Sequence, residues 1–187
     1  MDFKIPTFSI IVPTYNRAKR IKLLINSLLK INYPKENYEI IIVNDGSKDN
    51  TLEILKPFSN DLKVYTIKNS ERGFARNYGA SKSKNQYLNF FDSDDICLPN
   101  HLIYAASTII NYDFPEFIAQ GYQLRRDNGK ITFSTKWELN STLNKYLYKN
   151  ILGCDGVFIR NDIAKKNKFI EDRVFAGSED WILWFEI

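Results

Sequence analysis

The 187-residue sequence is poor in residues that build metal clusters and disulfide frameworks. It has two cysteines, Cys97 and Cys154, and one histidine, His101. Two cysteines this far apart, without a C-x-x-C spacing, form neither a zinc site nor a disulfide framework. Because free thiols are typical of a reducing compartment, we expect a cytoplasmic protein. We expect His101 to be a helix residue and not a metal ligand.

Long apolar runs and basic blocks are also missing. No stretch reaches the ~18 apolar residues that span a bilayer, and the first residues do not resemble a signal peptide. The net charge of +4 comes from scattered lysines, which argues against a nucleic-acid-binding role. This mild excess allows weak attraction to anionic surfaces. We therefore keep peripheral association with the inner face of the membrane as an alternative to a purely cytoplasmic location.

The composition is that of one globular domain, with 44% hydrophobic and 14% aromatic residues. Short β-branched runs alternate with amphipathic segments, which predicts a mostly parallel sheet flanked by helices. We expect strands at 8–12, 39–43, 62–67 and 87–91. We expect helices at 21–29, up to about 58, at 73–84 and from Pro99 onward, the last with Leu102, Ala106, Ile109 and Ile110 on one face.

The pattern changes after about residue 111. We expect strands at 117–124 and 130–134 around a turn, a helical stretch at 137–148 and a further strand at 156–160. A polar, basic segment follows at 165–168. The chain stops within a helical pattern at residue 187, from which we expect a C-terminal truncation.

The fourth expected strand ends in three closely spaced acids, Asp92, Asp94 and Asp95. Unpaired charges are costly inside a core, so the acids are expected where the strand leaves it. Crowded carboxylates repel one another, and magnesium or manganese relieves this repulsion while sharing oxygen ligands with substrate phosphates. The stretch predicts a site for a metal ion and a diphosphate. The alternative is that the acids only cap the next helix.

Polar clusters also follow the first two strands, at 13–17 and 45–47. Taken alone, each fits an ordinary turn as well as it fits a binding segment. Open α/β sheets, however, bind ligands beyond the carboxyl ends of their strands. Three polar clusters at three such ends together predict a nucleotide site.

Five segments of the sequence resemble glycosyltransferase family 2. They are, in order, FSIIVPTYNR at 8–17, IVNDGSKDNT at 42–51, GFARNYGA at 73–80, FFDSDD at 90–95 and GSEDWILW at 177–184. The resemblance implies a GT-A-like fold and inverting transfer of a sugar from a nucleotide-sugar to a hydroxyl acceptor, as in bacterial surface-glycan synthesis. It implies one domain over 1–187, with a nucleotide-sugar-binding half at 1–110 and an acceptor-side half at 111–187.

The resemblance also suggests donor-binding residues. Asp45 would accept the imide N–H of the base, which suits uracil and hence a UDP-sugar. In the DxD region, Asp94 would contact the ribose, and Asp94, Asp95 or Asp92 would bind manganese or magnesium. Arg76, ahead of Arg72, would reach the nucleotide or diphosphate. The expected nucleotide-binding residues are Pro13, Thr14, Tyr15, Arg17, Asp45, Arg76, Asp92, Ser93 and Asp94.

The late acidic motif would provide the catalytic group. An acceptor hydroxyl is a poor nucleophile until its proton is taken, and by resemblance Asp180 is the general base. Glu179 is a supporting group or the alternative base. Taken alone, acids in a first helical turn are ordinary helix stabilisers.

Features of processive synthases, the Gln-x-x-Arg-Trp motif and transmembrane helices, are missing. We therefore expect a non-processive hexosyltransferase that acts on a glycan or glycolipid acceptor. Two alternatives stay open: a nucleotide-sugar-binding domain without turnover, and a nucleotidyltransferase, although no Gly-rich phosphate loop with a lysine is present. No feature of the sequence indicates an oligomeric state.

Overall fold

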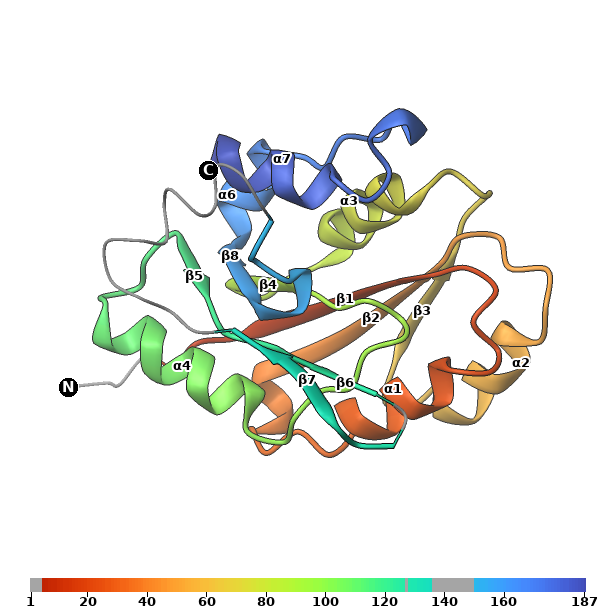
Figure 1. Cartoon of the computed structure of the whole chain (residues 1–187), viewed down its shortest axis with the longest axis horizontal. Coiled ribbons are helices and arrows are strands. Elements are labelled where there is room, and N and C mark those ends of the chain that lie inside the picture. The colour runs from red at the N-terminus through yellow and green to blue at the C-terminus, as the bar shows by residue number, and fades with distance from the viewer. Residues whose placement is uncertain (1–4, 127, 136–149) are drawn as a thin grey trace.

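A six-stranded sheet runs through the centre of the computed structural model, which describes residues 5–126, 128–135 and 150–187. The strands lie in the order β3-β2-β1-β4-β8-β5, and helices cover both faces (Figure 1). The central strands consist of β-branched and apolar residues, which favour a strand buried on both faces. The expected mixed α/β architecture with a mostly parallel sheet is confirmed.

Four neighbouring strands are parallel: β1 (Phe8–Thr14), β2 (Tyr38–Asn44), β3 (Lys63–Thr66) and β4 (Tyr87–Phe90). Next to β4, β8 (Val157–Arg160) runs antiparallel, and β5 (Phe117–Ala119) pairs antiparallel with β8. The carboxyl ends of the four parallel strands therefore share one edge of the sheet with the amino end of β8.

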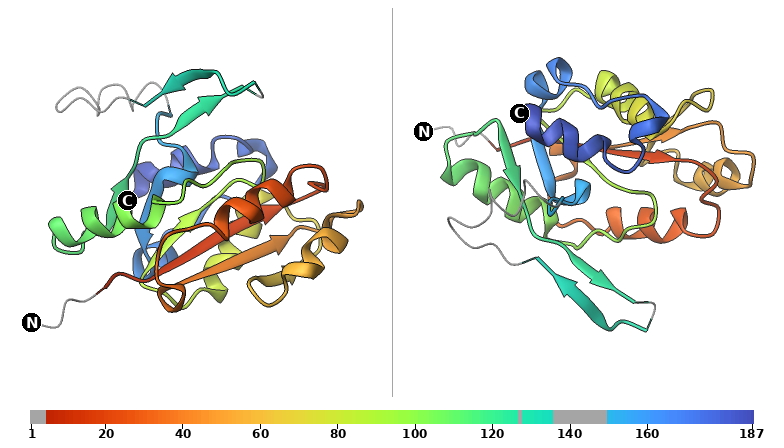
Figure 2. Two further views of the ribbon diagram at one scale, coloured as in Figure 1. Left: turned by 90° about the horizontal axis from the view of Figure 1, so that it is seen from below. Right: turned by 45° about the horizontal axis from the view of Figure 1, so that its top comes forward.

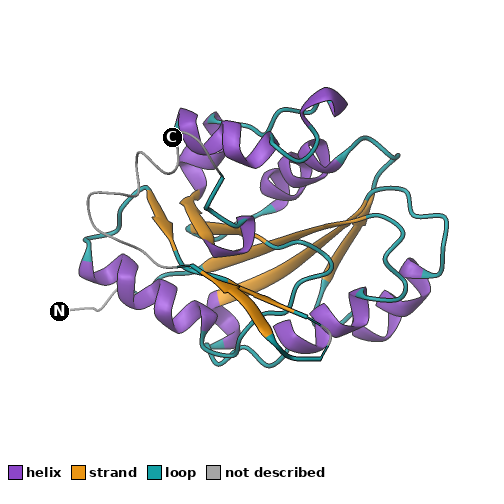
Figure 3. Ribbon diagram, in the orientation of Figure 1, coloured by secondary structure: helices purple, strands orange, loops and turns teal. Residues whose placement is uncertain are grey.

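Three helices cover one face of the sheet: α1 (Ile21–Leu28), α2 (Thr51–Leu55) and α4 (His101–Asn111). The other face carries α3 (Arg72–Lys82), α6 (Asn161–Lys166) and α7 (Glu179–Glu186), as Figures 1 and 3 show. Alternate residues of β1 face the two layers, since Ile10 packs with α1 and Ile11 packs with α3 and α7. Short 3₁₀ turns η1 to η4 lie at Lys35–Asn37, Lys56–Phe58, Cys154–Gly156 and Arg173–Phe175. In the described part of the chain, no helix is long and apolar enough to cross a bilayer.

A separate hairpin of β6 (Gln123–Arg125) and β7 (Ile131–Ser134) projects from the body (Figure 2). The prediction of one strand over 117–124 was wrong, because β5 and β6 belong to different sheets. The β5 pairing ends where Gln120 donates to the Gly156 carbonyl, at the start of β8. Beyond that point β8 offers no further partner, and the chain turns to pair with β7.

One expectation for α4 needs correction. Ile110 is exposed, whereas Ala105 joins Leu102, Ala106 and Ile109 on the buried face of α4. The helix lies on the sheet along its 102–105–109 side, so position 110 faces solvent. The expected helical stretch at 137–148 lies outside the described residues.

Candidate active site

A pocket of about 530 Å³ opens at the carboxyl edge of the parallel strands. The segments that follow β1, β2 and β4 all reach it. Eight of the nine residues expected to bind the nucleotide line it: Pro13, Thr14, Tyr15, Arg17, Asp45, Asp92, Ser93 and Asp94. Asn69, Glu71, Arg72, Ala75 and Arg173 complete the lining. The parallel sheet thus brings the three polar clusters together.

Asp45 is held firmly at this edge by the loop that follows β3. One carboxylate oxygen accepts a hydrogen bond from the backbone N–H of Ser70 at 2.7 Å, and the other accepts from Asn69 Nδ2 at 3.2 Å. The two loops approach closely at Gly46, where a Cβ would lie 2.9 Å from the backbone nitrogen of Asn69 and where φ is +69°. Burial raises the pKa of Asp45. A carboxylate has about four acceptor positions, so the group retains capacity for a ligand.

Thr14 places a second polar group next to Asp45. The Asp45 backbone N–H donates to the Thr14 carbonyl at 2.8 Å. The Thr14 hydroxyl is buried and has no hydrogen-bond partner among the described residues. Burying a hydroxyl without a partner costs free energy, so a ligand that reaches this oxygen would recover it.

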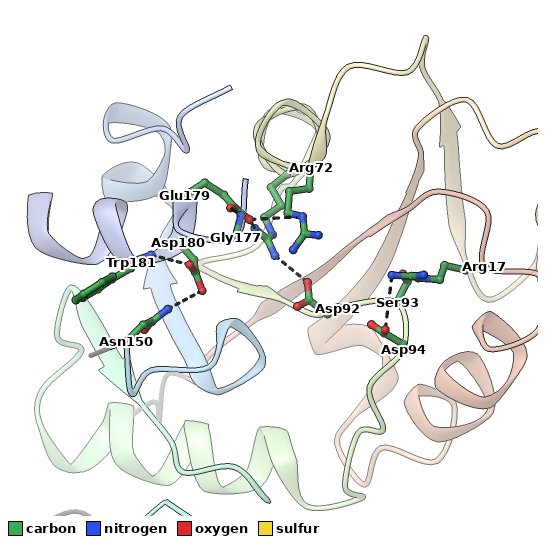
Figure 4. Close-up of polar contacts among 11 residues, drawn as sticks. Arg17, Arg72, Asp92, Ser93, Asp94, Asn150, Gly177, Glu179, Asp180 and Trp181 are labelled. Atoms are coloured by element: carbon green, nitrogen blue, oxygen red, sulfur yellow. Dashed lines mark hydrogen bonds and ion pairs between the residues drawn. The ribbon is translucent and has the colours of Figure 1, made fainter. Parts of the chain in front are cut away.

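Positive charge faces the acidic segment across the pocket. Arg17 Nε donates to Ser93 Oγ at 3.3 Å, and Arg17 Nη2 lies 3.6 Å from Asp94 Oδ2 (Figure 4). Both side chains of this ion pair are half-exposed, so the pair contributes little to stability. Arg72 lines the same pocket from the first turn of α3. These guanidinium groups suit an anionic diphosphate.

Arg76 does not line the pocket, although the sequence ranks it ahead of Arg72 as a nucleotide contact. It is 1% exposed, and its guanidinium lies between two carboxylates. Nη1 donates to Glu179 Oε1 at 2.6 Å, and Nη2 donates to Asp92 Oδ1 at 2.7 Å. Arg72, one helical turn earlier, is the arginine on the pocket side. Spacing places both arginines on one face of α3, but only packing decides which one is buried.

The two acids at the start of α7 have different surroundings. Glu179 is 2% exposed and is paired with Arg76. Asp180 is half-buried; its Oδ2 accepts from Asn150 Nδ2 at 3.1 Å, and its Oδ1 accepts from the Trp181 backbone N–H at 2.7 Å (Figure 4). Burial raises the pKa of Asp180. Asp180 is thus the more accessible candidate, whereas Glu179 is buried and bound to a buried cation.

An acid that the sequence reasoning missed, Asp155, lies near the end of β4. Burial and the charge of Asp92 raise its pKa to about 6. The pKa of Asp95 rises to about 7, first through burial of its carboxyl group and then through Asp155, Asp92 and Asp94. Asp155 precedes β8, and because β8 is antiparallel its start lies at the edge where β4 ends. The sequence does show an acid just before an expected strand, but it does not show that this strand runs antiparallel to β4.

The expected metal ligands do not form a ready-made cluster. Among the residues that the structure describes, no three His, Cys, Asp or Glu side chains are gathered closely enough to hold a metal ion. Asp92 is paired with Arg76, Asp94 with Arg17, and Asp95 is outside the pocket lining. His101 is partly buried, its Nε2 lies 3.0 Å from Asn89 Oδ1, and burial lowers the pKa of its imidazole to about 4. It lies at the start of α4, as expected for a helix residue.

Comparison with known proteins agrees with this geometry. The family model described as "Glycosyl transferase family 2" matches residues 9–163. The chain belongs to glycosyltransferase family 2. An uncharacterized glycosyltransferase of Rickettsia bellii (strain RML369-C) is 31% identical over 97% of this chain and 27% of its own length.

Two comparisons point to one family member, TarS of Staphylococcus aureus. The poly(ribitol-phosphate) beta-N-acetylglucosaminyltransferase TarS of strain Mu50 is 40% identical over 47% of this chain and 16% of that protein. The crystal structure of TarS 1–349 in complex with UDP matches with a TM-score of 0.78 and 29% identity, over 95% of this chain and 53% of that one. The chain therefore spans only part of these relatives. The expected family and the GT-A-type fold are confirmed.

Proposed function

We propose that this chain is the donor-binding and catalytic part of an inverting, non-processive glycosyltransferase. It transfers a sugar from a UDP-sugar to a hydroxyl of a glycan or glycolipid acceptor, in surface-glycan synthesis on the cytoplasmic side of the membrane. The main support is one pocket that is lined by Asp45, Asp92 and Asp94 and is linked through Arg76 to the helix that carries Asp180. The similarity to TarS, whose structure holds UDP, supports the nucleotide.

The donor fits the pocket by its chemistry. Asp45 accepts the imide N–H of uracil, and Thr14, whose buried hydroxyl has no partner among the described residues, lines the same pocket. A site that uses a buried acceptor in this way rejects bases that lack the matching donor. Arg17 and Arg72 offer their guanidinium groups to the diphosphate. The donor therefore lies along the ends of β1, β2 and β4.

A divalent cation, manganese or magnesium, is part of the proposal. Asp92 and Asp94 both line the pocket, and carboxylate oxygens are the ligands that these ions prefer. Magnesium is usually held by one or two carboxylates together with substrate phosphates, so this donor set fits a cation that shares the diphosphate. When bound, such an ion stabilises negative charge on the departing diphosphate.

Asp180 acts as the general base. Its raised pKa makes the carboxylate a stronger proton acceptor than an exposed aspartate. It takes the proton of the acceptor hydroxyl while the hydroxyl oxygen attacks the anomeric carbon from the face opposite the diphosphate, and the configuration is inverted. Glu179 supports this group through Arg76 and does not take the proton.

The test combines nucleotide binding with transfer. UDP should raise the melting temperature more than GDP or CDP does, and manganese should increase the effect. Asp180→Asn should keep UDP binding and lower transfer from a panel of UDP-sugars by about 10²–10⁴-fold. Asp113→Asn, at an exposed position after α4 with φ of +54° that asparagine tolerates, is the matched control.

Three results would contradict the proposal. Equal stabilisation by all nucleotides would remove the role of Asp45. Binding of UDP-sugars without transfer to any acceptor would favour a nucleotide-sugar-binding domain. Release of pyrophosphate from a nucleoside triphosphate would favour a nucleotidyltransferase.

A further inference from the structure

One buried guanidinium connects the donor pocket to the catalytic helix. Arg76 is 1% exposed, and it is bonded to Asp92 at 2.7 Å and to Glu179 at 2.6 Å. Asp92 lines the pocket, and 41% of its side chain is exposed. Glu179 is the first residue of α7 and the neighbour of Asp180. A ligand that contacts Asp92 is therefore connected to Glu179, at the start of α7, through a single residue, Arg76.

Glu179 also fixes the backbone at the start of α7. Its second carboxylate oxygen, Oε2, accepts the N–H of Gly177. Gly177 has a φ of +92°, a conformation that favours glycine. The carboxylate thus joins the turn before the helix to α3. Movement of Glu179 would move the first turn of α7, and with it Asp180.

The surroundings make this connection specific for arginine. A guanidinium has donors in a fixed planar fork, so it can hold two carboxylates in a set geometry, which a lysine ammonium cannot do. The ring of Phe169 lies 5.1 Å from the guanidinium carbon. Arg76 Nε is buried without a hydrogen-bond partner in the described residues. Arg76 is thus shared by two carboxylates, Asp92 and Glu179, and makes no other ion pair in the described part of the chain. Glu179 Oε1 also lies 3.8 Å from Arg72 Nε.

We propose that Arg76 is a positioning residue that couples occupation of the donor pocket to the placement of Asp180. A ribose hydroxyl or a cation that engages Asp92 takes up part of the acceptor capacity of that carboxylate. Arg76 then interacts more strongly with Glu179, and the first turn of α7 is held more rigidly. The inference rests on the proposed function, since it assumes that a nucleotide-sugar occupies this pocket.

The coupling has a measurable consequence in each direction. Binding free energies between coupled sites are reciprocal, so a change at Glu179 must also alter how firmly the donor is held. Misplacement of a catalytic group by about 1 Å can lower the rate by about 10²-fold. Loss of coupling should therefore reduce transfer much more than it reduces UDP affinity. If Arg76 instead bound the diphosphate directly, its substitution would lower UDP affinity and transfer together.

The experiment is hydrogen exchange of the 177–183 amides with and without UDP and manganese, together with UDP calorimetry and transfer rates. In the wild-type chain UDP should slow exchange at these amides. Arg76→Lys should retain UDP affinity within about threefold, lose the UDP-dependent slowing, and lower kcat by about 10²-fold. Ser81→Ala, an exposed change on the same helix, is the control.

The outcomes separate the two proposals. If the wild-type chain binds no UDP, the proposed function fails and this inference fails with it. If it binds UDP but exchange at 177–183 does not change, or if Arg76→Lys keeps the slowing, only the coupling is overturned. An equal loss of UDP affinity and transfer in Arg76→Lys would make Arg76 a diphosphate ligand instead. Should Arg76→Lys fail to fold, Glu179→Gln, which retains one acceptor for Arg76, should show the same loss of slowing.

Discussion

Gly73→Ala is a sharp test of how α3 is packed. A Cβ at Gly73 would lie 2.1 Å from the carbonyl oxygen of Ile170 and 3.1 Å from its carbonyl carbon. These are backbone atoms, so no side-chain rotation relieves the overlap. The 169–171 segment is also tied to α3, because Asn77 bonds both the carbonyl of Phe169, at 2.9 Å, and its N–H, at 3.0 Å. Either the segment or the helix must move.

The cost follows from two opposing terms. Overpacking a close contact destabilises by about 1–3 kcal/mol, and the upper end applies where backbone must shift. Alanine gains about 1 kcal/mol over glycine in a helix interior, and Gly73 lies in the first turn of α3, so the gain here is at most about 1 kcal/mol. The net loss is therefore about 2 kcal/mol. For a chain of this length it should lower the melting temperature by about 4–8 °C.

Urea unfolding and thermal melting measure this change directly. The control is Ser81→Ala on the exposed side of α3, which should be neutral or gain about 0.5 kcal/mol through helix propensity. In Gly73→Ala, Phe169 is pushed away from Arg76, so transfer should fall more than UDP affinity does. If the variant is as stable as Ser81→Ala, the close approach of α3 and the 169–171 segment is wrong.

Three further predictions concern the pocket. Asp45→Ala should weaken UDP binding by about 10–100-fold, the value of a hydrogen bond to a charged group; an unchanged calorimetric Kd would remove its role in base binding. Chelation with EDTA should weaken UDP-sugar binding and abolish transfer, and full activity in EDTA would exclude the cation. Because the pKa of Asp180 is raised, and a base works only when deprotonated, kcat should fall as the pH drops through a value above the ordinary aspartate range. If kcat stays constant as the pH is lowered to about 4, Asp180 does not have that role.

Much of the site could be predicted from spacing alone. The alternation of strands and helices predicts parallel strands, and parallel strands place their carboxyl ends together. Polar residues after three such strands must then meet, and the pocket contains residues from all three segments: Thr14, Asp45 and Asp94. The motifs around them were sufficient to recognise the family.

Other features depended on contacts between distant segments. Which of Arg72 and Arg76 faces the pocket is decided by Phe169 and Glu179, about one hundred residues away in the sequence. Asp155 reaches the β4 edge only because β8 runs antiparallel, and no local pattern specifies strand direction. Local propensity and periodicity predict an element and its buried face, but not which distant segment packs against that face.

The sequence by itself therefore determined the alternating strands and helices of the first half, the four parallel strands and the strand ends at which ligand-binding groups gather. These follow from hydrophobic periodicity, from turn chemistry and from the alternation of strands with helices. Only the tertiary structure decided that Glu179 is neutralised by Arg76 while Asp180 is not. The reason is physical: the partner and burial of a charged group depend on which segments pack against it, and here those segments are α3, β4 and α7.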